Sequence, residues 1–128
     1  MTSVLNVDTI ADKAGTGPVG LTKQHAAKVW ANFDMDGTQA LNDSFNVSSI
    51  SDISTGKSTI TYTNAMSNAN YSCVTNCVHD SGSYFTSLNV LHDTPPTAST
   101  VSLEAMIQNT AASTDAEFNS IANHGDLA

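Results

Sequence analysis

The chain has little charge and few aromatic residues. Charged residues make up 12% of its 128 positions and aromatic residues 6%, whereas a typical soluble domain carries about 25% charged residues. Ser, Thr and Asn together supply roughly a third of the chain, a bias shared by extracellular β proteins, fibre proteins and disordered tracts. Regular apolar alternation argues against disorder, so solubility must rest on uncharged polar side chains.

Arginine is absent, and four lysines face twelve acidic residues, for a formal charge of −8. Proteins that grip phosphates need a basic surface, so we expect neither nucleic-acid binding nor association with an anionic bilayer. No apolar run approaches the ~20 residues that span a membrane, and the first residues lack a signal-peptide layout. We therefore expect synthesis in a cytosol and no membrane insertion.

Cysteine is scarce, with two residues, Cys73 and Cys77. Four residues along one strand separate Cα atoms by ~13 Å, whereas a disulfide needs about 4.4–6.8 Å. We therefore expect both thiols to fill the core. The C-x3-C-x-H pattern that they form with His79 lacks an evident fourth zinc ligand.

Motifs for catalysis and for cofactors are also missing from the sequence. It has no G-x-S-x-G elbow, and the Gly15 to Gly20 stretch lacks the Lys-Ser or Lys-Thr of a phosphate-binding loop. We expect a protein that is not an enzyme and that binds no cofactor.

Short polar and apolar alternations, broken by Gly, Asp and Asn turns, fill residues 29–124. Strands at roughly ten-residue spacing predict a mainly β fold, an antiparallel β-sandwich of jelly-roll-like type spanning residues 21–128. The expected strands are residues 29–33, 38–41, 44–50, 58–63, 71–78, 84–91, 101–108 and 117–124. The residues expected to point inward are Trp30, Phe45, Val47, Ile60, Tyr62, Val74, Val78, Phe85, Val90, Val101, Leu103, Ile107, Phe118 and Ile121.

Residues 1–20 form a separate region, a short alternating strand followed by a Gly-rich link. An isolated strand needs a partner, so this N-terminal extended arm either packs on its own domain or adds to a neighbouring subunit or particle. Its apolar contacts would come from Val4, Leu5, Val7 and Ile10. The next segment, residues 22–29, predicts a short helix capped by Thr22.

Residues 32–43 nearly match an EF-hand calcium loop. Position 12 is Asp43 instead of Glu, and no convincing helix flanks the loop. A hairpin turn explains the same D-x-D-G pattern, because Asp and Gly both favour turns. If a cation binds, Asp34 and Asp36 are the expected ligands.

Two later loops could display binding residues on a rigid scaffold, or could be solvated links. The candidates for binding in these exposed loops are His79, Asp80, Tyr84, His92 and Asp93. A carbohydrate-binding module would use exposed aromatic residues, for which Tyr84 and Phe85 are the candidates, although we expect them in the core.

Several segments of the chain match a known pattern. They read W-x-N-F at 30–33, G-T-x-A-x-x-D-S-F-N-V-S-S-I at 37–50, a T-G turn, T-I-T-Y-T at 59–63, A-M-x-x-A-N-Y at 65–71 and a final H-G-D-L-A. In these blocks the chain resembles a small domain of tail-fibre-like or structural virion proteins of tailed bacteriophages, mostly marine ones. The resemblance covers residues 4–17, 28–71 and 121–128.

The resemblance implies a structural virion protein, made in the cytoplasm of a bacterial host. It implies a homotrimer that contacts other virion proteins of the tail, connector or capsid through the N-terminal arm. One placement is a short tail or head fibre whose outer loops could contact a glycan or protein of the host surface. The alternative is a decoration protein that stabilises the capsid.

Overall fold

The computed structural model describes residues 26–79 and 85–128, and in these residues the fold is mainly β. The β propensity of Val, Ile, Thr and Tyr and the two-residue alternation of apolar positions favour extended chain throughout. The strands are β1 Val29–Asp34, β2 Ala40–Phe45, β3 Val47–Ser54, β4 Lys57–Tyr62, β5 Ser72–Val78, β6 Thr86–Val90, β7 Thr100–Ile107, β8 Ala112–Ser113 and β9 Phe118–His124.

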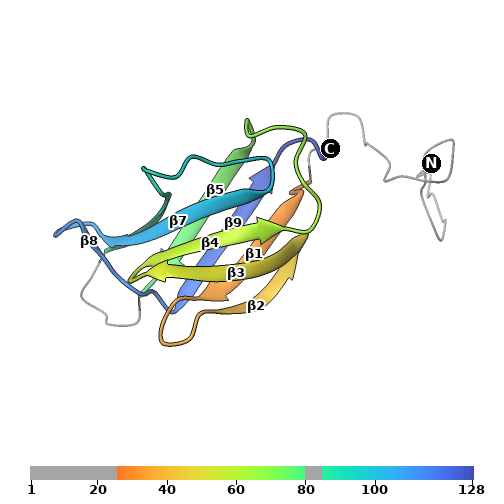
Figure 1. Ribbon diagram of the computed structural model, residues 1–128. Helices are drawn as coiled ribbons and strands as arrows, with labels where there is room; N and C mark the ends of the chain where they lie inside the picture. Colours follow the sequence, from red (N-terminus) through yellow and green to blue (C-terminus); the bar gives the residue numbers. More distant parts are fainter. Residues whose placement is uncertain (1–25, 80–84) are drawn as a thin grey trace, which may run out of the picture.

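The strands form two antiparallel sheets that lie face to face (Figure 1). The first has the order β2-β1-β9-β5; the second has the order β3-β4-β7-β6, with β8 paired to β7. The chain passes from the first sheet to the second at Asn46, the single residue between β2 and β3, whose φ is 59°. Asn tolerates this left-handed conformation better than most residues do.

The eight strands expected from the sequence correspond to β1 to β7 and β9. Six agree with the structure within two residues at each end, while β2 and β3 lie further along the chain than predicted. The two-residue strand β8 was not predicted. Its register pairs Met106 with Ser113 and Ile107 with Ala112, and such a short pairing leaves no periodic signal in the sequence.

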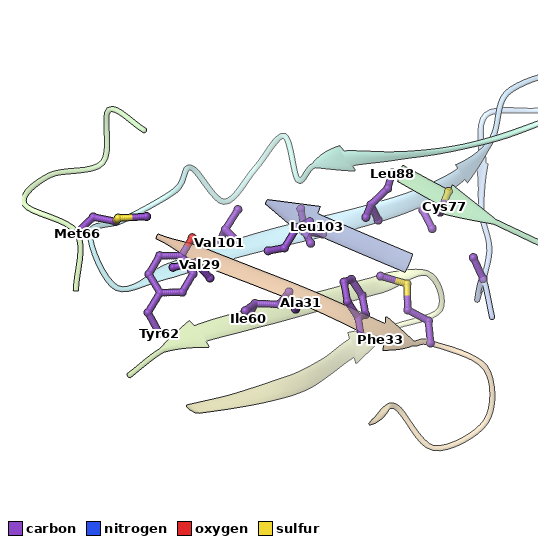
Figure 2. Close-up of a cluster of buried hydrophobic side chains, with 14 residues drawn as sticks. Val29, Ala31, Phe33, Ile60, Tyr62, Met66, Cys77, Leu88, Val101 and Leu103 are labelled. Atoms are coloured by element: carbon purple, nitrogen blue, oxygen red, sulfur yellow. The ribbon is translucent and has the colours of Figure 1, made fainter. Parts of the chain in front are cut away.

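The hydrophobic core lies between the two sheets (Figure 2). The first sheet contributes Val29, Ala31 and Phe33 from β1, all at most 1% exposed. The second sheet contributes residues from β4, β6 and β7: Ile60, Tyr62, Leu88, Val101, Leu103 and Ala105. Each large side chain buried in this way stabilises the fold by about 1.5–3 kcal/mol.

The predicted inward set is only partly correct. Ile60, Tyr62, Val101, Leu103 and Ile121 are buried, and Val47 packs against the core at its margin. Seven of the residues expected inside are instead exposed: Trp30, Phe45, Val74, Val78, Phe85, Val90 and Phe118. In β1 and β5 the parity opposite to the expected one faces the core, whereas β9 buries Ile121 as expected and exposes Phe118. A one-residue shift in a strand moves every side chain to the other face.

The expected helix at residues 22–29 is not supported where it can be assessed. Residues 26–28 have no helical structure, and Val29 begins β1. The remainder of that segment, together with the N-terminal arm, lies outside the described residues.

The chain enters and leaves the domain at the same end, because Val29 of β1 pairs with Asn123 of β9. There the last residues close over the loop between β4 and β5: Leu127 forms a β-bridge with Met66, and the Ala128 amide donates to the Ala65 carbonyl at 3.0 Å. A Cβ on Gly125 would lie 2.8 Å from Cβ of Tyr71. The terminal H-G-D-L-A sequence therefore has a packing role, with glycine required for close approach.

Candidate functional site

The Asp34 and Asp36 segment is the turn of the β1–β2 hairpin. Asp34 Oδ1 accepts a hydrogen bond from the Asp36 amide at 2.8 Å, and Gly37 takes a φ of +63°. An Asp that binds the amide two residues ahead forms an Asx-turn, a common way to begin a chain reversal. This geometry accounts for the D-x-D-G pattern as a turn, so that Asp34 already has a structural role.

Metal-binding groups do not cluster in the described part of the chain. No group of three or more His, Cys, Asp or Glu side chains there is placed to hold an ion. His79, the third member of the C-x3-C-x-H pattern, instead lies with Nδ1 3.9 Å from Glu117 Oε2.

Both cysteines are free thiols on the inner face of β5. Burial raises the pKa of Cys73 to about 11 and also raises the pKa of Cys77. A thiol with a raised pKa is a poor nucleophile and metal ligand at neutral pH. The expected core role is confirmed for Cys77, whereas Cys73 is only partly buried. The neighbouring valines, Val74 and Val78, lie on the outside.

A chain of polar side chains links the two sheets near the termini. Asn123 Nδ2 donates to the Tyr62 hydroxyl at 2.7 Å, Tyr62 donates to the Tyr71 hydroxyl at 2.9 Å, and Tyr71 donates to the Thr100 carbonyl at 3.1 Å. The two tyrosine rings pack edge to face. Burial, followed by the hydrogen bond to Tyr71, raises the pKa of Tyr62 far above its ordinary value. Asn123 belongs to β9 of the first sheet and Tyr62 to β4 of the second, so this series of hydrogen bonds joins the two sheets.

Two buried asparagines of β9 have incomplete hydrogen bonding. Asn119 and Asn123 are fully buried, and the Oδ1 atom of each has no partner in the described residues. Register places Asn119 opposite Cys77 and Asn123 opposite Cys73. An unpaired buried acceptor costs about 1–3 kcal/mol, which offsets part of what the Nδ2 hydrogen bonds of the same two side chains contribute.

The loop residues proposed from the sequence do not form one site. His79 follows β5, whereas His92 and Asp93 follow β6, so they flank opposite ends of the five-residue strand β6, about 17 Å long. His92 Nδ1 lies 2.5 Å from Asp93 Oδ1 in a fully exposed turn. Asp80 and Tyr84 fall outside the described residues. Phe85, expected in the core, is 80% exposed.

The outer face of the first sheet carries a row of apolar side chains that crosses all four strands. Trp30 lies directly opposite Phe45 on β2 and Ala122 on β9, and Ala122 lies opposite Val74 on β5. We call these four residues the Trp30 row. Trp30 is 36%, Phe45 53% and Val74 58% exposed. An exposed apolar row in register is typical of a surface that contacts another chain segment.

The outer face of the second sheet has the opposite character. Thr59 and Ser102 share a hydrogen bond of 2.8 Å across β4 and β7, and Lys57 lies 3.4 Å from Glu104 on the same strands. Ser113 donates to Glu104 at 2.6 Å. This face satisfies its polar groups internally and suits contact with water.

The sequence does not predict the Trp30 row, because three of its members, Trp30, Phe45 and Val74, are expected in the core. The missed signal was the spacing of Val29, Ala31 and Phe33, a second apolar alternation in the same strand as Trp30. Comparison of the chain with protein-family models, curated proteins and solved structures found no match. No helix in the described residues is both long enough and apolar enough to cross a membrane.

Proposed function

We propose that the protein is a non-enzymatic structural subunit of a tailed-phage virion, a short fibre or appendage of the tail or head. The observation that carries the proposal is the contrast between the two outer faces. One presents the Trp30 row and the other a polar surface of Ser, Thr and paired charges. A rigid β domain with one apolar face is suited to a fixed place in an assembly.

The phage assignment itself rests on the resemblance of residues 4–17, 28–71 and 121–128. In space the last two blocks are neighbours, since β1 lies between β2 and β9 and the C-terminal residues close over the loop that ends at Tyr71. This continuity supports treating the blocks as one unit of the fold and the segment between them as variable.

The proposed subunit assembles as a homotrimer on the virion. Its N-terminal arm, with Val4, Leu5, Val7 and Ile10, attaches it to tail, connector or capsid proteins. The arm connects to the domain at the end where β1 begins and β9 finishes. The opposite end of the sheet, where β5 finishes at Val78, then contacts a glycan or protein of the host surface.

We also propose that the sandwich is of the jelly-roll-like type. It is supported by the pairing of β1 with β9, which brings the first and last strands together in one sheet. The four-stranded and five-stranded sheets around one core are close to the general form of this class, which has eight strands in two sheets.

A second placement is a decoration protein that stabilises the capsid. The apolar Trp30 row favours it, since a cement subunit needs a flat surface to lie on the capsid lattice. The two placements differ in copy number, because a capsid lattice offers far more positions than a tail or a single vertex.

The test is the copy number of the chain in purified virions of the phage that encodes it, measured by quantitative mass spectrometry against the major capsid protein. A few copies to tens per particle would support a fibre or appendage. Hundreds would support the decoration protein. Absence from the virions would contradict both placements.

A further inference from the structure

We propose that the Trp30 row is the docking site for residues 4–10 of the same molecule, so that the free subunit carries its N-terminal arm folded back on its own first sheet. The inference concerns the isolated chain. It can therefore fail without affecting the virion assignment, and the reverse also holds.

The size of the row favours a short segment over a second domain. At the exposed fractions given above, the row offers roughly 300 Å² of apolar surface. A stable interface between two proteins buries about 800 Å² on each partner. An extended segment of seven residues is about 23 Å long, and the row crosses four strands over about 14 Å.

The central strands restrict how anything can bind there. β1 is paired with both β2 and β9, and β9 with both β1 and β5, so their backbone hydrogen-bonding groups are already engaged. The occupant must therefore lie across the strands and contact them through side chains. Leu5 and Val7 lie on one side of an extended segment, and they match the apolar character of the row.

Charge also favours the arm. Residues 26–128 contain two lysines and ten acidic residues, a net charge of −8, whereas residues 1–25 contain two of each. Two copies of the domain repel each other when their faces approach. Residues 4–10 carry a single charge, that of Asp8, so they meet much weaker repulsion than a second domain would.

The position where the described chain starts brings the arm within reach. Trp30 is four residues after Ala26, near the end of the sheet at which the chain enters. The fifteen residues 11–25 include three glycines, and a Gly-rich link of this length spans about 20 Å on average. A tethered segment at this distance has a millimolar effective concentration, so contact within one molecule outcompetes contact between dilute molecules.

Trp30 is the chain's single tryptophan, so its fluorescence reports on the docking site alone. We would measure the emission maximum and acrylamide quenching of the full chain and of Leu5→Asp/Val7→Asp. The matched control is Thr16→Asp/Thr22→Asp, which adds the same charge to residues 1–25 outside the apolar run. The expected result is a red shift and stronger quenching in the first variant, with the control unchanged.

A second pair of variants places the substitutions in strand β5 of the first sheet instead of in the arm. Val74→Asp, within the row, should also release the arm and increase quenching, whereas Asn76→Asp, two residues along the same strand face, should not. Near-UV circular dichroism of the buried tyrosines verifies that each variant is folded. Equal quenching in wild type and in the Leu5→Asp/Val7→Asp chain would overturn the proposal.

A dilution series distinguishes docking of the arm within one molecule from contact with a neighbouring copy. Over an about hundredfold dilution, docking within one molecule leaves the quenching of the wild type unchanged. Quenching that increases on dilution would overturn the proposal in favour of a contact from a neighbouring copy.

Discussion

Replacing Gly56 by alanine should destabilise the domain far more than the same change at Gly37. Both glycines lie in hairpin turns with positive φ, +69° and +63°. A Cβ at Gly56 would lie 2.6 Å from the Thr114 amide nitrogen and 2.8 Å from the Ala105 carbonyl oxygen, whereas a Cβ at Gly37 would meet no atom within 4 Å. Comparing the two alanine variants therefore separates the cost of a positive φ, which both share, from the cost of a steric clash, which only the Gly56 variant has.

The left-handed conformation costs a non-glycine residue about 1–2 kcal/mol, partly offset because alanine restricts the unfolded chain by about 0.4–1 kcal/mol. Gly37→Ala should therefore lose about 1 kcal/mol. At Gly56 the obstructing atoms are backbone, so the β3–β4 turn must move. Moving it weakens the bond from the Gly56 amide to Asp115 and the bond from the Ala105 amide to the Gly56 carbonyl, which adds about 2–4 kcal/mol.

Urea denaturation of the two variants and the wild type, monitored by circular dichroism, measures both free energies of unfolding. In thermal melts each 1 kcal/mol corresponds to about 4–8 °C for a domain of this size, so the two variants should melt at least ~10 °C apart. Losses that agree within about 0.5 kcal/mol would refute the close packing of the turn against Thr114.

Three further predictions test the core and its polar groups. Phe33→Ala should cost about 3–5 kcal/mol because it leaves a cavity, whereas Phe45→Ala, on the outer face, should cost less than about 1 kcal/mol; equal losses in urea titrations would contradict the register of β1 and β2. The pKa of Tyr62 is raised by burial, so its contribution to stability is complete below the unfolded pKa of about 10 and declines as pH rises above it; Tyr62→Phe should flatten this decline in melts between about pH 9 and 11, and an unchanged slope would exclude Tyr62 as its source. Cys77, which is 7% exposed, should react with a thiol reagent at pH 8 far more slowly than a free thiol, because burial shields it and raises its pKa; rapid labelling of Cys77 in the native protein would show that it is accessible.

The candidate interaction surface could not be read from the sequence, although its residues could be named. Trp30 and Phe118 are among the largest apolar side chains, and placing them inside is the usual expectation. β1 instead buries Val29, Ala31 and Phe33, and β9 buries Asn119 and Asn123. Buried asparagine is uncommon enough to point a sequence interpretation of β9 toward the wrong face. The polar link from Asn123 through Tyr62 to Tyr71 joins positions 61 and 9 residues apart, and nothing local indicates that they meet.

Local sequence by itself determined the extended strands, the positions of most turns and the antiparallel class. Alternation of apolar residues and the Asp, Asn and Gly turn signals act over a few residues, so they can be read without a partner. Only the tertiary structure decided which face of each strand is buried, how the strands are ordered in two sheets, and that the four residues of the Trp30 row lie side by side on the outer face. Those features depend on pairings between distant strands. Because the side chains of a strand alternate, a change of one residue in such a pairing exchanges the core with the surface.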